Sequence, residues 1–476
     1  MALSRVPVEF ILQLLPLLSK QDTSRLSRTC KRLRSITLAH VYRTIEWRWD
    51  VRGVQHIPAV SPPIHLLLRS LMENPVVGGY VERVDFQGSK NYYGSGNPYT
   101  LWAPEALPKT ADSELQAAIE WVRYFGLGKP DIWNAALGRR DIDAYASLVL
   151  AFLPNLCSLL LGADFVSNST FLGCLFKEPL LRSSDRVTVS TFPRYTQLLE
   201  AHLGPASESK VRRDISSRFR DLYSVLYLPS LEVLTMELGS EQRFHWPSPS
   251  QRPRLASLTS LKLPHCEATE TALERILSTK PPLKELLYDY SCAEACSYHA
   301  PYFFNLSTLS RALYHVHATL ESLELQIQYR AAMYECPAYS NGCFKGSLDS
   351  FHHFARLSQL QIPFIMLSGW YRNPDQNVRP LSSQLPLSIR QLCFNDDMTD
   401  WECYAWGPRT WLDRVRNLID DHHVSQGETI PSLQGVELSL ARSAVEWGKE
   451  DQAEFETICK GFRIQSTFQK IRACGS

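Results

Sequence analysis

Short leucine-patterned segments recur along most of this chain. In several of them one leucine is followed by others three and five positions later, as at Leu258, Leu261 and Leu263. Successive side chains of a strand point to opposite faces, so Leu261 and Leu263 share one face and the residues beside them face the other way. The segments are Leu156–Leu161, Leu231–Leu234, Leu258–Leu263, Leu283–Leu286, Leu320–Leu325, Leu357–Leu360, Ile389–Leu392 and Leu433–Leu438. Stacking such strands side by side would give them one continuous core.

This pattern is typical of the strand of a leucine-rich repeat. Helical stretches lie between the strands, at Ala144–Leu153, Glu270–Ser278 and Leu309–His317. We therefore predict an α/β fold: an irregular leucine-rich-repeat-like solenoid with a curved parallel sheet. The alternative is an α/β domain that has several buried strands and no solenoid.

The spacing of the segments is irregular. The steps from Leu234 to Leu261 and on to Leu286 match a repeat of about 20–29 residues, whereas the other steps are longer. The gap between Leu159 and Leu234 has room for one or two degenerate strands, and Val81–Phe86 is a candidate for an earlier one. Loops must therefore be inserted between some of the repeats.

The first part of the chain carries a different pattern. Apolar residues Ile11, Leu14, Leu15 and Leu18 follow i, i+3, i+4, i+7 spacing, which predicts an amphipathic helix. Pro7 and Glu9 suit its first turn, because proline needs no N–H there and an acid favours the positive end of the helix dipole. Asp22 is the expected N-cap of a second helix, with Leu26, Cys30 and Leu33 on its apolar face. The joint apolar face is large for so short a segment and predicts a partner helix.

Val6 to Ile45 resembles the F-box, the motif by which substrate receptors dock on the Skp-type adaptor of cullin–RING ubiquitin ligases. The stretch Trp133–Leu161 is similar to fungal F-box proteins with degenerate leucine-rich repeats. Thr23 stands where a leucine is usual in the motif, and Pro16 lies in the last turn of the first helix. The F-box resemblance rests on Pro7, Glu9, Ile11, Leu14, Leu15, Leu18, Asp22, Leu26, Cys30, Lys31, Arg32, Leu33, Arg34 and the exit segment Val41–Ile45. It implies that the adaptor-binding residues are Pro7, Glu9, Ile11, Leu14, Leu15, Leu18, Leu26, Cys30 and Leu33.

The resemblance implies a non-catalytic substrate-recognition subunit of an SCF-type ligase. Residues 1–47 would bind the adaptor, 48–130 would form a linker and a first irregular repeat with an exposed loop rich in Gly, Pro and Tyr, and 131–476 would bind a protein substrate. Two alternatives stay open. One is an F-box scaffold without a role in ubiquitination, and the other is an enzyme with a cryptic cysteine or zinc site.

The substrate would lie on the polar face of the strands. Residues beside the central leucines point away from the core, and aromatic and arginine side chains at the strand ends would frame the site. The predicted substrate-binding residues are Lys262, Glu285, Tyr288, Tyr290, Glu324, Arg330, Gln359, Trp370, Tyr371 and Gln391. Because acids outnumber bases on this face, we expect a partner segment that carries Lys or Arg.

Composition and motifs exclude several other classes. Fifty Lys and Arg balance 49 Asp and Glu, which argues against a general polyanion binder, and no base-reading motif accompanies the basic second helix. No apolar run approaches the roughly 20 residues of a membrane helix, and Glu9 interrupts the one stretch that resembles a signal peptide. The twelve scattered cysteines indicate reduced thiols in a cytoplasmic or nuclear protein. We therefore expect neither nucleic acid nor membrane as a partner.

The sequence contains few signs of a catalytic or cofactor-binding site. It has no P-loop, nucleophile elbow, zincin motif or dinucleotide fingerprint. Cys292, Cys296, His299, Cys336 and Cys343 could in principle hold zinc, but their spacing fits no standard set of ligand pairs. We therefore expect no catalytic residue, no metal and no cofactor.

Overall fold

The computed structural model of the chain has two compact units, Met1–Met236 and Glu237–Ser476. The described residues are 6–50, 63–89, 111–166, 170–181, 195–204, 220–238, 246, 252–292, 304–329, 344–346, 348, 351–368, 380–397, 407–424, 433–440 and 447–470.

The first unit begins with short helices: α1 (Val8–Leu14), the 3-10 turn η2 (Leu15–Leu17), α2 (Lys20–Ser27) and α3 (Lys31–Tyr42). The prediction that Asp22 caps the second helix is wrong. Ser19 is the N-cap, since its Oγ accepts the main-chain N–H of Asp22 at 3.1 Å. Cys30 then starts a separate helix, because its Sγ accepts the N–H of Leu33 at 3.5 Å. The segment that reads as one amphipathic helix is therefore two.

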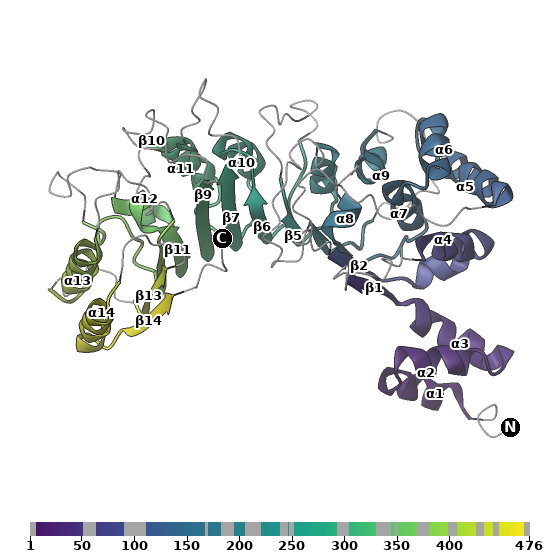
Figure 1. Cartoon of the computed structure of the whole chain (residues 1–476), viewed down its shortest axis with the longest axis horizontal. Coiled ribbons are helices and arrows are strands. Elements are labelled where there is room, and N and C mark those ends of the chain that lie inside the picture. Colours follow the sequence, from purple (N-terminus) through teal and green to yellow (C-terminus); the bar gives the residue numbers. More distant parts are fainter. Residues whose placement is uncertain are drawn as a thin grey trace, which may run out of the picture. The chain divides into compact units, whose positions relative to one another are not determined.

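The sheet of the first unit is parallel. It contains, in spatial order, β1 (Thr44–Asp50), β2 (Arg83–Ser89), β3 (Ser158–Leu161), β4 (Glu200–Leu203) and β5 (Val233–Met236) (Figure 1). One row across these strands is Ile45, Val84, Leu159, Ala201 and Leu234, and all five side chains are buried. The segment between Leu159 and Leu234 does hold a degenerate strand, β4.

Helices complete the first unit. They are α4 (Ile64–Glu73), η3 (Pro75–Tyr80), α5 (Asp112–Phe125), α6 (Pro130–Gly138), α7 (Ile142–Ala151), α8 (Ala163–Val166), α9 (Thr170–Leu181) and η4 (Arg220–Tyr227). Helix α7 is central, because it is buried from Asp143 to Ala151 and contacts α4, α6, α8 and α9. The turn η3 passes so close to the end of α7 that a Cβ on Gly78 would overlap the carbonyl of Phe152. Only glycine fits at that position.

The second unit repeats the arrangement of a parallel sheet with helices beside it. Its parallel sheet runs β6 (Ser260–Cys266), β7 (Glu285–Cys292), β9 (Ser322–Tyr329), β11 (Gln359–Pro363), β12 (Gln391–Asn395), β13 (Gly435–Leu440) and β14 (Gln465–Lys470). Beside it lie α10 (Glu270–Leu277), α11 (Leu306–Tyr314), η7 (Phe351–His353), α12 (Phe364–Ser368), α13 (Pro408–Val424), α14 (Lys449–Gly461) and the short pair β8 (Phe304–Asn305) and β10 (Phe344–Lys345) (Figure 1).

The leucine row explains this sheet. Leu261, Leu286, Leu323, Leu360 and Leu392 occupy matching positions on neighbouring strands, and each is 0–2% exposed. Burying a side chain of this size contributes about 1.5–3 kcal/mol. The predicted α/β class, the parallel sheet and the burial of these leucines are confirmed.

The structure differs from the prediction at one domain boundary and at the last strand. The boundary at residue 47 falls inside β1, so the N-terminal helices continue directly into the first sheet. The strand β14 has no leucine pattern and was not expected. Among the described helices, none combines the length and apolar character needed to cross a membrane.

Candidate functional site

Two surfaces of the molecule are candidates for binding: an apolar surface on the N-terminal helices and the polar face of the sheet. We call the first the helical apolar surface. The name covers the exposed apolar side chains of α1, η2 and the residue that follows, which flank the buried Ile11 and Leu15 on both sides. They are Val8, Phe10, Leu12, Leu14, Leu17 and Leu18, whose exposed fractions are 37, 61, 51, 48, 80 and 37%.

Behind the helical apolar surface, the N-terminal helices have a small core of their own. Ile11, Leu15 and Leu33 are only 1–3% exposed, and Val6, Leu26, Cys30 and Ile36 pack around them. The prediction that Ile11, Leu15 and Leu33 contact an adaptor is therefore wrong for the described conformation. Leu26 and Cys30 are half-buried against the same core, whereas Pro7, Glu9, Leu14 and Leu18 are exposed.

The helices are apolar on more than one side, and this decides what remains exposed. Ile11 and Leu15 are four residues apart and face Leu33, so Phe10 and Leu14 share a different face of the same helix. Sequence periodicity grouped Ile11 and Leu15, which form the internal core, with Leu14 and Leu18, which are exposed. The predicted adaptor-binding residues did not include Phe10, Leu12 and Leu17. These apolar residues lie between the predicted positions in the sequence, which indicates that the segment is apolar on a second side.

The N-terminal helices join the first sheet without an intervening loop. Helix α3 ends at Tyr42 and β1 begins at Thr44. The carbonyl of Arg43 between them accepts main-chain N–H groups of Glu82 and Arg83 at 2.9 and 3.1 Å, and its guanidinium contacts the Glu82 carboxylate at 2.7 Å. This arrangement holds the helices at a defined position beside β1 and β2.

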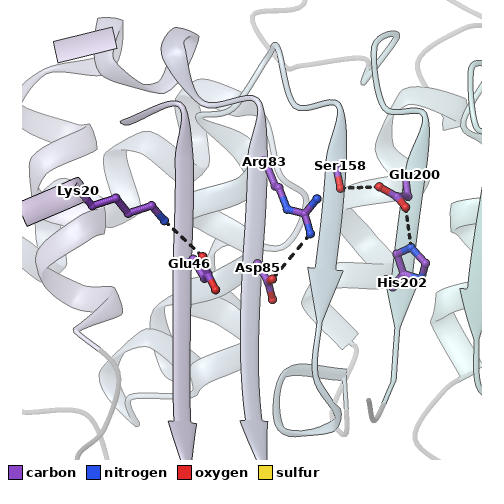
Figure 2. A network of polar contacts seen from close by, with 7 residues as sticks. All are labelled: Lys20, Glu46, Arg83, Asp85, Ser158, Glu200 and His202. Carbon is purple, nitrogen blue, oxygen red and sulfur yellow. Dashed lines mark hydrogen bonds and ion pairs between the residues drawn. The ribbon is translucent and has the colours of Figure 1, made fainter. Parts of the chain in front are cut away.

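A side-chain contact supports the same junction. Lys20 of α2 reaches Glu46 of β1, with Nζ 3.3 Å from Oε2 (Figure 2). Both side chains are well exposed, so this ion pair contributes at most about 1 kcal/mol. The continuity of the main chain therefore matters more than the pair.

Figure 2 shows polar side chains of the first sheet, which lie on the face opposite the buried row that runs from Ile45 to Leu234. Glu200 accepts a hydrogen bond from Ser158 Oγ at 2.9 Å, and its other carboxylate oxygen lies 3.0 Å from Nε2 of His202. The hydrogen bond with His202 is the main cause that lowers the pKa of Glu200. The carboxylate separates the serine from the histidine, so the imidazole is not placed to activate the hydroxyl as a nucleophile.

The polar face of the second sheet carries most of the predicted substrate-binding residues. Lys262, Glu285, Gln359 and Gln391 are exposed there, and Glu324 is half-buried. Lys262 Nζ lies 3.5 Å from Glu285 Oε2 on the neighbouring strand. The structure therefore brings these residues onto one face, as the sequence predicted.

The side chain of Gln391 lies in the space that a side chain at Gly435, on the neighbouring strand, would fill. A Cβ on Gly435 of β13 would overlap the carboxamide of Gln391, which occupies that space. The glycine at this register position therefore provides room for the glutamine.

Two predicted residues are in the wrong place. Tyr288 and Tyr290 lie inside β7, are 1 and 2% exposed, and pack against Phe304. The Tyr288 hydroxyl donates to the carbonyl of Ala268 at 2.8 Å. They were expected in a loop, but β7 continues to Cys292, and their spacing from Leu286 in steps of two turns both rings into the core. They therefore cannot frame a surface site.

Other predicted residues lie outside the described part of the chain. These are Arg330, Trp370 and Tyr371 of the substrate site, and Cys296, His299, Cys336 and Cys343 of the zinc alternative. Within the described part, no group of three or more His, Cys, Asp or Glu side chains has the arrangement to hold a metal ion.

No protein-family model matches this chain, and no curated protein matches its sequence significantly. The assignment of a function therefore depends on the two surfaces themselves.

Proposed function

We propose that this chain is a non-catalytic substrate-recognition subunit of an SCF-type cullin–RING ubiquitin ligase. Its N-terminal helices would dock on a Skp-type adaptor, and its repeat-like sheet would bind a protein substrate. The observation that carries the proposal is the helical apolar surface, formed by six large apolar side chains that the described chain leaves in water.

The free energy of burial supports a partner at this surface. Moving a fully exposed Leu or Phe side chain into an apolar contact contributes about 1.5–3 kcal/mol. Phe10 and Leu17 retain 61 and 80% of their exposure, so most of that contribution is still available. The internal core of Ile11, Leu15 and Leu33 keeps the helices folded while the outer side chains remain free to meet a partner helix.

The mechanism that follows is proximity. The adaptor would bind the helices, and the sheet would hold a protein substrate. Holding the substrate close to the ubiquitin-loaded enzyme raises the effective concentration of its lysines. The receptor itself then needs no side chain that makes or breaks bonds.

Charge substitution on the helical apolar surface tests the docking step. Leu14→Asp combined with Leu17→Asp would place two unpaired carboxylates in the interface, and we expect at least ~100-fold weaker adaptor binding, or about 2.7 kcal/mol. Ala39→Asp, on an exposed position of α3, is the matched control. Leu15 is unsuitable because it belongs to the internal core.

The measurement is co-purification of the full-length chain with a Skp-type adaptor, followed by titration of the purified components. Circular dichroism of each variant checks that the helices remain folded. Unchanged adaptor affinity of the folded double variant would overturn the docking proposal.

The ligase role has its own test. A partner recovered with the chain should be ubiquitinated when adaptor, cullin, RING subunit and conjugating enzyme are added. Modification should be lost with the double variant and retained with Ala39→Asp. A partner that binds but is never modified would favour a scaffold instead.

A further inference from the structure

Strand β6 contains a bulge that changes the polar face of the second sheet. Leu263 pairs with Tyr288 and Cys266 pairs with Tyr290, so Pro264 and His265 together stand opposite the single residue Asp289. His265 has a φ of 48°, in the left-handed region that non-glycine residues seldom adopt. Bulges of this kind re-aim a side chain, and here the re-aimed side chain is a histidine.

The bulge places His265 directly against Asp289. The main-chain N–H of His265 donates to Asp289 Oδ2 at 3.0 Å, and the ring atom Nδ1 lies 3.0 Å from the same oxygen. That ring contact lacks hydrogen-bond geometry, so Nδ1 is left without a hydrogen-bond partner among the described residues. One carboxylate oxygen of Asp289 is therefore occupied by the backbone of the bulge.

The other oxygen of Asp289 is buried without a donor. The residue is only 4% exposed, and Oδ1 accepts no hydrogen bond from any described residue. A buried acceptor without a donor costs free energy that a bound donor would recover. This unsatisfied atom points to a ligand that carries N–H groups.

Glu324 adds a second carboxylate on the neighbouring strand. Leu287 of β7 is level with Glu324 of β9, and Asp289 is level with Gln326, so both carboxylates lie on the polar face of neighbouring strands. Gln326 donates to Glu324 Oε1 at 2.6 Å. Burial raises the pKa of Glu324, and the negative charge of Asp289 acts in the same direction, whereas the hydrogen bond from Gln326 and the charge of Lys262 lower it.

One lysine lies near these carboxylates. Lys262 lies on the adjacent strand, where its ammonium is 3.5 Å from Glu285. We define the acceptor cluster as His265, Asp289 and Glu324. It presents two carboxylates on adjacent strands, and the His265 ring lies against one of them.

We infer that the acceptor cluster binds the guanidinium of an arginine in a protein segment that lies on the polar face of the second sheet. This inference rests on the proposed function and names the chemistry of the substrate it would recognise. Guanidinium suits the cluster because its five donors form a planar fork that can meet two carboxylates, and because it is less strongly hydrated than an ammonium.

Peptides that differ at one position provide the test. The probes are an arrayed set of 12-residue peptides of mixed sequence, each made with arginine, lysine or citrulline at its central position. Citrulline keeps the shape of arginine but removes its charge. We expect the full-length chain to bind the arginine members at least tenfold more tightly than the citrulline members, and more tightly than the lysine members.

Two substitutions localise the effect. Asp289→Asn keeps an acceptor for the main-chain N–H of His265 and should abolish the arginine preference. Glu437→Gln removes one negative charge from the same polar face on β13 and should change the preference less than twofold. Thermal melting of both variants verifies that they are folded.

Each result decides a separate question. Equal binding of arginine and citrulline peptides by the wild type, or a preference that persists in folded Asp289→Asn, would overturn the arginine site. Equal binding of lysine and arginine would overturn the choice of guanidinium. Adaptor co-purification through the helical apolar surface is measured on the same proteins, so failure of the arginine site is distinguishable from failure of the proposed function.

Discussion

Asp143 should make the stability of the first unit depend on pH. It is the second residue of α7, is 1% exposed, and accepts the main-chain N–H groups of Phe171 and Leu172 at 2.9 and 3.3 Å. Its carboxylate thus links α7 to the first turn of α9. Burial raises the pKa of Asp143 to about 8, and the nearby charge of Asp141 acts in the same direction, whereas the hydrogen bonds from Phe171 and Leu172 lower it.

The direction of the effect follows from proton uptake. In the unfolded chain an aspartate releases its proton near pH 3.9. Between that pH and about 8, the folded state keeps a proton that the unfolded state has lost, so the free energy of unfolding falls as pH rises. The contribution is complete below pH 4 and is lost as pH rises through the folded pKa.

The magnitude comes from the separation of the two pKa values. A full difference of one bound proton corresponds to about 1.4 kcal/mol per pH unit. From pH 5 to pH 7 the free energy of unfolding should therefore fall by about 2.5 kcal/mol on account of this carboxyl alone.

Asp143→Asn isolates that contribution, because asparagine keeps the shape and one acceptor oxygen but does not titrate. Urea unfolding of variant and wild type at each pH, followed by tryptophan fluorescence, gives the difference. Trp133 is a local reporter, since its ring contacts Phe171 with centroids 4.5 Å apart. Asp131→Asn, at an exposed position of α6, is the control. A variant-to-wild-type difference that stays constant from pH 5 to pH 7, or that moves in favour of the wild type as pH rises, would refute the reasoning.

Two further predictions concern the second unit and the cysteines. Leu261→Ala should lower the free energy of unfolding by about 2–5 kcal/mol, because Leu261 is fully buried in the leucine row; Leu387→Ala, at a residue that is 52% exposed, is the comparison in urea unfolding, and an equal effect of both would contradict the row. Burial raises the pKa of the Cys393 thiol to about 12, while Cys174 is exposed on α9. Iodoacetamide at pH 8 should therefore label Cys174 well before Cys393, as followed by peptide mass spectrometry, and similar rates would show that Cys393 is accessible as a thiolate.

The strands that the sequence predicted share one repeated pattern of leucine spacing. Leu261 and Leu286 carry the same register of apolar residues, and residues two apart in a strand necessarily share a face. The period alone places the residues of such a row on one face. β1 had a similar signal, with Ile45 and Trp47 alternating with polar residues, but that stretch was interpreted as the exit of the N-terminal helices. β14 carries no such alternation, and its pairing with β13 depends on tertiary context.

The sequence by itself determined that the chain forms helices at its N-terminus and then parallel strands with a leucine face and a polar face. Only the tertiary structure decided which apolar side chains remain exposed: Ile11 and Leu15 meet Leu33, while Phe10 and Leu17 meet no core. It also decided that Asp289 meets His265, because one extra residue in β6 shifts the register between two strands. Periodicity states which residues share a face. It does not state which segment covers that face, since that depends on contacts between residues far apart in the chain.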